Sequence, residues 1–284
     1  MFVNLSLAET AIEFVQTILD LWNKSYTKVV TILTTSPSEL YPEAWTTMGN
    51  VAGYLASIGA ALLIVFFYIG LTKTTLHFEE LRRPERFIGP VVRLVIGEAL
   101  VINGYTLLLK VLEIFQGIIN GVFQITGDAG DSGQVAKIPD ELVQSVGQLD
   151  TGQSILILLV GVLMGAIIWL LSVILVLLIY VRFFKIYIYA AVAPIPLSSV
   201  SGEGTSRIAK TFAMNYLGVC FQGVLIIIAF ALFKSLAIDS YTIDPNLSTL
   251  QNFMGFMGGV LLQMLLLVIT VRTTEKLTKE MIGG

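Results

Sequence analysis

The chain has 284 residues, of which 55% are hydrophobic and 13% are charged, and its mean hydropathy is +0.83. This composition excludes a soluble globular domain and predicts an all-α integral membrane protein. The formal net charge of −3 argues against a nucleic-acid-binding surface, and a single cysteine with a single histidine leaves no basis for a disulfide framework, a thiolate metal cage or a histidine-centred triad.

Residues 5–34 show apolar side chains at alternating spacings of three and four, among them Val15, Leu19 and Trp22. This spacing predicts an amphipathic helix. The other face is too polar for a membrane span, so we expect the helix either at the membrane interface or packed on a partner. We assign residues 1–44 to an extracytoplasmic segment.

The first predicted span is Trp45 to Leu71, which has no charged residue. The segment that follows, Lys73 to Arg86, carries several arginines among acidic residues, and the positive-inside tendency places it in the cytoplasm. The amphipathic helix therefore lies outside.

Three polar residues interrupt the second predicted span, Phe87 to Leu109: Arg93, Glu98 and Asn103. Arg93 is close enough to the cytoplasmic end to reach the headgroups. Glu98 is near mid-membrane, where an unpaired acidic residue costs on the order of 3 kcal/mol. Glu98 is therefore expected to face protein or a polar cavity, or to be protonated. Either it serves a proton relay or, as we favour, it accepts a structural hydrogen bond from Asn215, Gln222 or Gln263.

The third predicted span, Ile155 to Val181, is uncharged over roughly 40 Å of helix, more than the ~30 Å of bilayer hydrocarbon. Its apolar character resumes after Arg182 and Lys185. Pro194 and Pro196 remove two backbone donors and disfavour helical geometry in the residues before them, so we expect a helix break just past the cytoplasmic surface.

The linker before this span, Gly127 to Gly152, is acidic and is expected outside. Thr211 to Phe233 and Phe253 to Val271 complete five spans, with the N-terminus outside and the C-terminus inside. Residues 45–276 form the membrane domain and residues 277–284 a short cytoplasmic tail. The rival is a sixth span through Phe183 to Val200, which would move Arg207 and Lys210 outside.

Two groups of residues stand out as motifs. Arg182, Lys185, Arg207 and Lys210 form a predicted cytoplasmic basic cluster; the last two could bind a lipid phosphate or an acidic partner surface, or serve only to fix the topology. Two Gly-x-x-x-Gly pairs could let helices approach closely, within one subunit or between copies. These pairs are Gly161 with Gly165 and Gly255 with Gly259.

No motif of a known enzyme class is present: a Gly-rich phosphate loop, HExxH and GxSxG are all missing from the sequence. We therefore expect no enzyme, no catalytic residue, no metal site and no cofactor. A small-molecule or ion transporter, or a permease subunit, is the alternative function. Secondary transporters usually show paired interrupted helices in two related halves, whereas this sequence has one clear break and no repeat.

The run Phe183-Phe184-Lys185 leading into Ala190-Ala191-Val192-Ala193-Pro194-Ile195-Pro196-Leu197 resembles the TrbL-like (VirB-type) polytopic inner-membrane subunits of type IV secretion and conjugative transfer systems. The resemblance extends over residues 45–275. The chain is short for such a subunit, so roles of a long C-terminal extension are not transferred.

The resemblance implies a structural or channel subunit in a bacterial cytoplasmic (inner) membrane. Such a subunit would form part of a translocation or pilus-assembly platform for DNA or protein. The implied partners are other secretion membrane subunits, ATPases, membrane lipids, further copies in a homo-oligomer and, transiently, the transferred DNA or protein.

Overall fold

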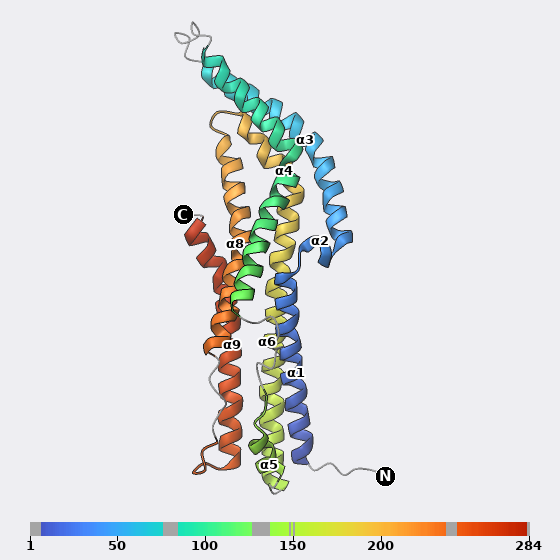
Figure 1. The fold of residues 1–284 in the computed structure, drawn as a ribbon, viewed down its shortest axis with the longest axis vertical. Helices are drawn as coiled ribbons and strands as arrows, with labels where there is room; N and C mark the ends of the chain where they lie inside the picture. Colours follow the sequence, from blue (N-terminus) through green and yellow to red (C-terminus); the bar gives the residue numbers. More distant parts are fainter. Residues whose placement is uncertain are drawn as a thin grey trace. The chain divides into compact units, whose positions relative to one another are not determined.

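The computed structural model describes residues 7–75, 85–126, 137–147, 149, 151–236 and 243–282, and their regular secondary structure is helical throughout (Figure 1). The helices are α1 (Leu7–Thr34), α2 (Pro37–Leu40), α3 (Pro42–Thr75), α4 (Glu85–Ile125), α5 (Asp140–Gly147), α6 (Thr151–Val192), α7 (Pro194–Ser198), the 3-10 turn η2 (Ser199–Ser201), α8 (Ser206–Leu236) and α9 (Thr249–Ile282).

Among the described residues, five helices are long and apolar enough to cross a membrane: α3, α4, α6, α8 and α9. Each contains one of the five predicted spans, so the all-α membrane class and the number of such helices are confirmed. The second predicted span continues as a helix beyond Leu109, because α4 runs without interruption to Ile125. The single histidine, His77, lies outside the described residues, as do residues 76–84 of the first predicted loop and residues 127–136, 148 and 150 of the second.

The chain divides into two compact units, to which several helices contribute different parts. The first comprises Met1–Thr34, Gly121–Tyr180 and Ile226–Thr274, and the second comprises Thr35–Asn120, Val181–Leu225 and Glu275–Gly284.

In the first unit, α1 packs alongside α6. Its apolar stripe is fully buried at Val15, Leu19 and Trp22. A Cβ placed on Gly161 would lie 3.0 Å from Val15, and the Lys28 ammonium lies 5.5 Å from the centre of the Tyr180 ring. Because the contacts advance in the same direction along both helices, α1 and α6 run parallel. We had expected the stripe to face the interface or a partner; the chain's own third predicted span covers it.

The short helix α5 in the first unit was not predicted. It lies within the segment expected to be an acidic linker, and its acidic first turn contains Asp140 and Glu141. Acidic residues there interact favourably with the N-terminal end of the helix dipole. Leu142 and Val146, four residues apart, are buried on one face. With Val143, three apolar positions in eight residues are too short a pattern to distinguish from a loop.

The core of the second unit gathers around α8. Phe212, Tyr216 and Cys220 are buried there together with Leu108 and Leu112 of α4. The Tyr216 hydroxyl donates to the Leu108 carbonyl at 2.7 Å, which satisfies its buried polar atom.

The segment after Lys185 lies beside α3 in this unit. Trp45 packs edge-on against Tyr187, a Cβ on Gly59 would lie 2.7 Å from the Pro194 carbonyl oxygen, and a Cβ on Gly70 would lie 2.8 Å from the Glu203 nitrogen. The break is therefore level with the middle of the apolar part of α3. The sequence predicts the helix break just past the cytoplasmic surface of the membrane, and this packing does not match that position.

The contact between Gly70 and Glu203 bears on the number of spans. It brings the end of the first span together with the turn that precedes α8. The five-span arrangement requires these segments on one side of the membrane, whereas the six-span alternative puts them on opposite sides. At the other end of the same span, Trp45 packs on Tyr187, which both arrangements place towards the opposite side of the membrane from Trp45. These contacts therefore match neither arrangement in full.

Candidate functional site

The helix break is confined to a single residue between α6 and α7. α6 ends at Val192 and α7 begins at Pro194, with Pro194 and Pro196 in the first turn of α7. Backbone N–H groups in a first turn have no partner within the helix, so proline is tolerated there. The expectation that the preceding residues leave helical geometry is wrong for Ala193, whose φ of −47° and ψ of −41° are those of a right-handed helix.

Serine hydroxyls secure the turn after the break. The Ser199 hydroxyl accepts from the Ala209 N–H at 3.0 Å, and this bond joins the turn to the start of α8. The Ser201 hydroxyl donates to the Leu63 carbonyl at 2.9 Å, and this bond joins the turn to α3. Both serines are buried. The break is thus a packed junction between α3, α6 and α8.

Arg182 is buried at the point where α6 meets α8, with only 2% of the residue exposed. Its Nε donates to the Val219 carbonyl at 3.1 Å, and its Nη2 donates to the Cys220 carbonyl at 3.3 Å. Gly223, one turn further on, leaves the space for the guanidinium, since a Cβ there would overlap it. Arg182 therefore fastens α6 to the backbone of α8.

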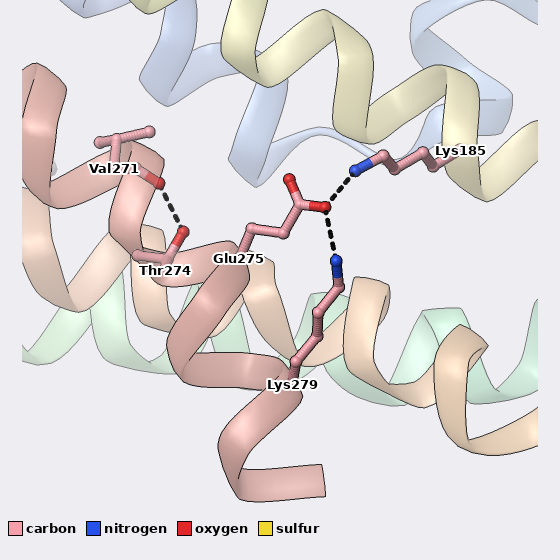
Figure 2. A network of polar contacts seen from close by, with 5 residues as sticks. All are labelled: Lys185, Val271, Thr274, Glu275 and Lys279. Atoms are coloured by element: carbon pink, nitrogen blue, oxygen red, sulfur yellow. Dashed lines mark hydrogen bonds and ion pairs between the residues drawn. The ribbon is translucent and has the colours of Figure 1, made fainter. Parts of the chain in front are cut away.

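One turn beyond Arg182, Lys185 belongs to a polar network with the end of α9 (Figure 2). The Lys185 Nζ lies 2.8 Å from Glu275 Oε1, and the Lys279 Nζ lies 3.4 Å from the same oxygen. In the same helix, the Thr274 hydroxyl donates to the Val271 carbonyl at 2.6 Å. Because Glu275 accepts from both lysines, it couples α6 to the last turns of α9.

A cavity of about 240 Å³ adjoins this network. Polar residues from three helices line it: Lys185 of α6, Asn215 and Gln222 of α8, and Glu275 and Lys279 of α9. Apolar side chains, including Met214, Val219 and Ile282, also line it. The cavity is therefore amphipathic, with its charged groups at one part of the wall.

The structure separates the predicted basic cluster into two pairs. Arg182 and Lys185 lie against the middle of α8 and the end of α9. Arg207 and Lys210 are exposed near the start of α8. Val219, which Arg182 contacts, is twelve residues beyond Arg207, or roughly 18 Å along a helix. The two pairs therefore face different surroundings.

The three polar residues of the second span also differ in their surroundings. Arg93, which the sequence predicts to reach the headgroups, pairs with Glu203 at 3.2 Å. Asn103 is exposed and donates to the Ala99 carbonyl of its own helix at 3.0 Å. Glu98 is exposed, and within the described ranges no residue bonds to it. The expected hydrogen bond from Asn215, Gln222 or Gln263 does not form.

The two glycine pairs have different environments. Gly161 and Gly165 receive α1: a Cβ on Gly165 would lie 3.0 Å from the Phe14 ring. In contrast, Gly255 is exposed, and no atom of the described residues lies within 4 Å of a Cβ placed on Gly259. The first pair thus serves packing inside the chain, and the second faces open space.

Sequence reasoning missed Glu275 and the burial of Arg182. Glu275 is 90 residues from Lys185 along the chain, and local spacing gives no sign of a contact at that distance. The available signal for Arg182 was weak: α8 contains glycine at positions 218 and 223, which is unfavourable in a helix interior unless something packs closely.

A comparison with protein-family models matches residues 22–194 to the family described as TrbL/VirB6 plasmid conjugal transfer like protein. The match begins within α1, covers α3, α4 and α6, and ends at the helix break. The predicted resemblance extended to residue 275, so its part in α8 and α9 lies beyond the match. Comparisons with curated proteins and with solved structures gave no match. Since the matched region is more than half of the chain, the protein belongs to the TrbL/VirB6 plasmid conjugal transfer family, whose members are membrane subunits of conjugative type IV secretion systems.

Proposed function

We propose that this protein is a non-enzymatic structural or channel subunit of the inner-membrane platform of a conjugative type IV secretion apparatus. In this proposal several copies assemble with one another and beside the secretion ATPases, and the assembly supports transfer of DNA or protein or the growth of a pilus. Family membership supports the setting. The exposed Glu98 carries the argument for assembly.

Glu98 lies about eleven residues into the apolar part of α4, and it is exposed with no described partner. In lipid, such a side chain costs on the order of 3 kcal/mol. A donor from a neighbouring subunit would remove this cost. Gly255 and Gly259 support the same proposal, because their open surface allows another helix to approach closely.

The test replaces Glu98 by Leu in cells that carry the rest of the apparatus. We expect normal insertion and protein level, because the change makes α4 more apolar. The affinity between subunits should fall about tenfold for each ~1.4 kcal/mol of binding free energy that the replacement removes. Conjugative transfer and crosslinking to the secretion ATPases should fall together.

Glu113→Leu is the matched control. Glu113 is an exposed glutamate on the same helix, beyond the predicted span, and it pairs with Lys110 at 2.8 Å. Its replacement should leave transfer unchanged. Normal transfer by Glu98→Leu would contradict the role of Glu98, and solute flux by the purified protein alone in liposomes would favour the transporter alternative.

A further inference from the structure

We propose that the cavity lined by α6, α8 and the last turns of α9 binds the headgroup of a zwitterionic phospholipid, with the phosphate on Lys185 and Lys279 and a primary ammonium on Glu275. The proposal rests on the charges and walls of this cavity and not on the proposed role in conjugation. Most residues of this site, including Glu275 and Lys279, lie beyond the family match over residues 22–194, whereas Lys185 lies within it.

The charges at the cavity favour a ligand that carries both signs. The charged wall holds two lysines and one glutamate, so it presents groups of both signs to a ligand. Each lysine ammonium has three donors, and one from each is used by Glu275. Donors therefore remain for a phosphate. Both ion pairs use Oε1 of Glu275, so its Oε2 can accept from an ammonium group.

Asn215 adds an uncharged polar contact. Its side chain is exposed and lines the cavity, and within the described part of the chain it makes no hydrogen bond. The amide can donate to a phosphate or ester oxygen. A cavity of about 240 Å³ is smaller than the ~300–1,000 Å³ that enclose drug-sized ligands. It suits a headgroup and not a complete lipid.

The apolar surroundings favour a lipid over a soluble phosphate. Met214, Val219 and Ile282 form part of the wall. Close to Lys185 along α6, Phe184 is 63% exposed and Ile188 is 58% exposed. Acyl chains can lie on this surface while the headgroup enters the cavity, because a lipid needs an apolar path directly beside its charged contacts.

The test measures thermal unfolding and binding of the full chain in detergent with added phosphatidylethanolamine. We expect Tm to rise with the lipid concentration and direct binding of the lipid to saturate. Lys279→Gln should bind about tenfold more weakly, because it loses a charge-assisted hydrogen bond. Lys279 is 74% exposed, so this variant should fold normally, and its Tm without lipid verifies that. Lys276→Gln, which removes a lysine from the same turn but not from the cavity wall, should bind like the wild type.

Further binding measurements test the ammonium contact and distinguish a lipid from a soluble headgroup. Phosphatidylglycerol, which has the phosphate but no ammonium, should bind more weakly than phosphatidylethanolamine, and Glu275→Gln should abolish that difference. Equal binding of the two lipids to the wild type would overturn the ammonium contact. A full shift with soluble phosphoethanolamine would overturn the lipid source, and wild-type binding by Lys279→Gln would overturn the site itself.

Discussion

Arg182 shows how a charged residue can hold a membrane protein together without an acidic partner. In the described residues its hydrogen bonds go to two backbone carbonyls of α8. Main-chain carbonyls in a helix carry partial negative charge and keep a second lone pair for such a donor. The arrangement requires the guanidinium to lie almost on the helix backbone, and only glycine at position 223 permits that.

Gly223→Ala should therefore destabilise the fold. The added methyl group overlaps the guanidinium, which must shift away from the Val219 and Cys220 carbonyls. Inserting a methyl group into a well-packed core typically costs about 1–3 kcal/mol. Thermal unfolding of the purified protein in detergent measures the loss as a lower Tm.

Gly117→Ala is the control for helix propensity. Gly117 is exposed on α4, and no atom of the described residues lies within 4 Å of a Cβ placed there. This change should be neutral or stabilise by up to about 1 kcal/mol, because alanine favours helix. If both variants had the same Tm, the close contact between Arg182 and Gly223 would be disproved.

The sequence identifies Arg182 and Glu275 as charged residues, but it does not show what they contact. Arg182 ends an uncharged run, which is where a basic residue normally reaches water, so its burial runs against the usual pattern. Glu275 is followed by Lys279 at a helical spacing that suggests only a local ion pair. The contact with Lys185 depends on how α6 and α9 pack, and that information lies in no single segment.

At the scale of elements, hydropathy predicted the long helices well. Uncharged runs such as Ile155 to Val181 have few alternatives to a helix, since lipid cannot satisfy backbone groups. Prediction failed where the element was short or its neighbours decided its conformation. α5 had too few apolar positions to be recognised. Ala193 stays helical and fully buried in the core with Leu108 and Phe212, despite the restriction that proline places on the preceding residue.

Replacing Pro194 and Pro196 together by Ala tests the function of the break. The change restores two backbone donors and removes roughly 3 kcal/mol of helix penalty where α6 could continue. A continuous helix would carry Ser199 and Ser201 away from Ala209 and Leu63. We expect normal insertion and protein level, together with loss of transfer in a mating assay.

Ile195→Val in the same turn is the matched control. It keeps both prolines and changes the side-chain volume slightly, so transfer should be unaffected. Wild-type transfer by the double-proline variant at an unchanged protein level would mean that the break only ends the helix.

For the whole molecule, the arrangement across the membrane remains a prediction that labelling can test. In a Cys220→Ala background, cysteine at position 131 or 240 should react with a membrane-impermeant maleimide in intact cells. Cysteine at Ser206, which is exposed at the start of α8, should react only after lysis. Gly202, in the turn before α8, is unsuitable for cysteine labelling because a side chain there would meet the Phe66 carbonyl.

Cysteine at position 80 provides the comparison. The contact between Gly70 and Glu203 places the end of α3 beside the turn before Ser206. Positions 80 and 206 should therefore label under the same conditions. If position 206 reacted in intact cells and position 80 did not, the five-span arrangement would be wrong.

The packing of α1 on α6 has a consequence for synthesis. Val15 leaves the ribosome long before Gly161, its partner in the folded chain. At ~5–20 residues per second, the wait is on the order of ten to thirty seconds. Throughout this interval the apolar stripe of α1 lacks its final cover, and a transient holding site at the membrane surface would protect it. Biogenesis therefore includes a delayed docking step, in which the first helix to be made waits for the third predicted span.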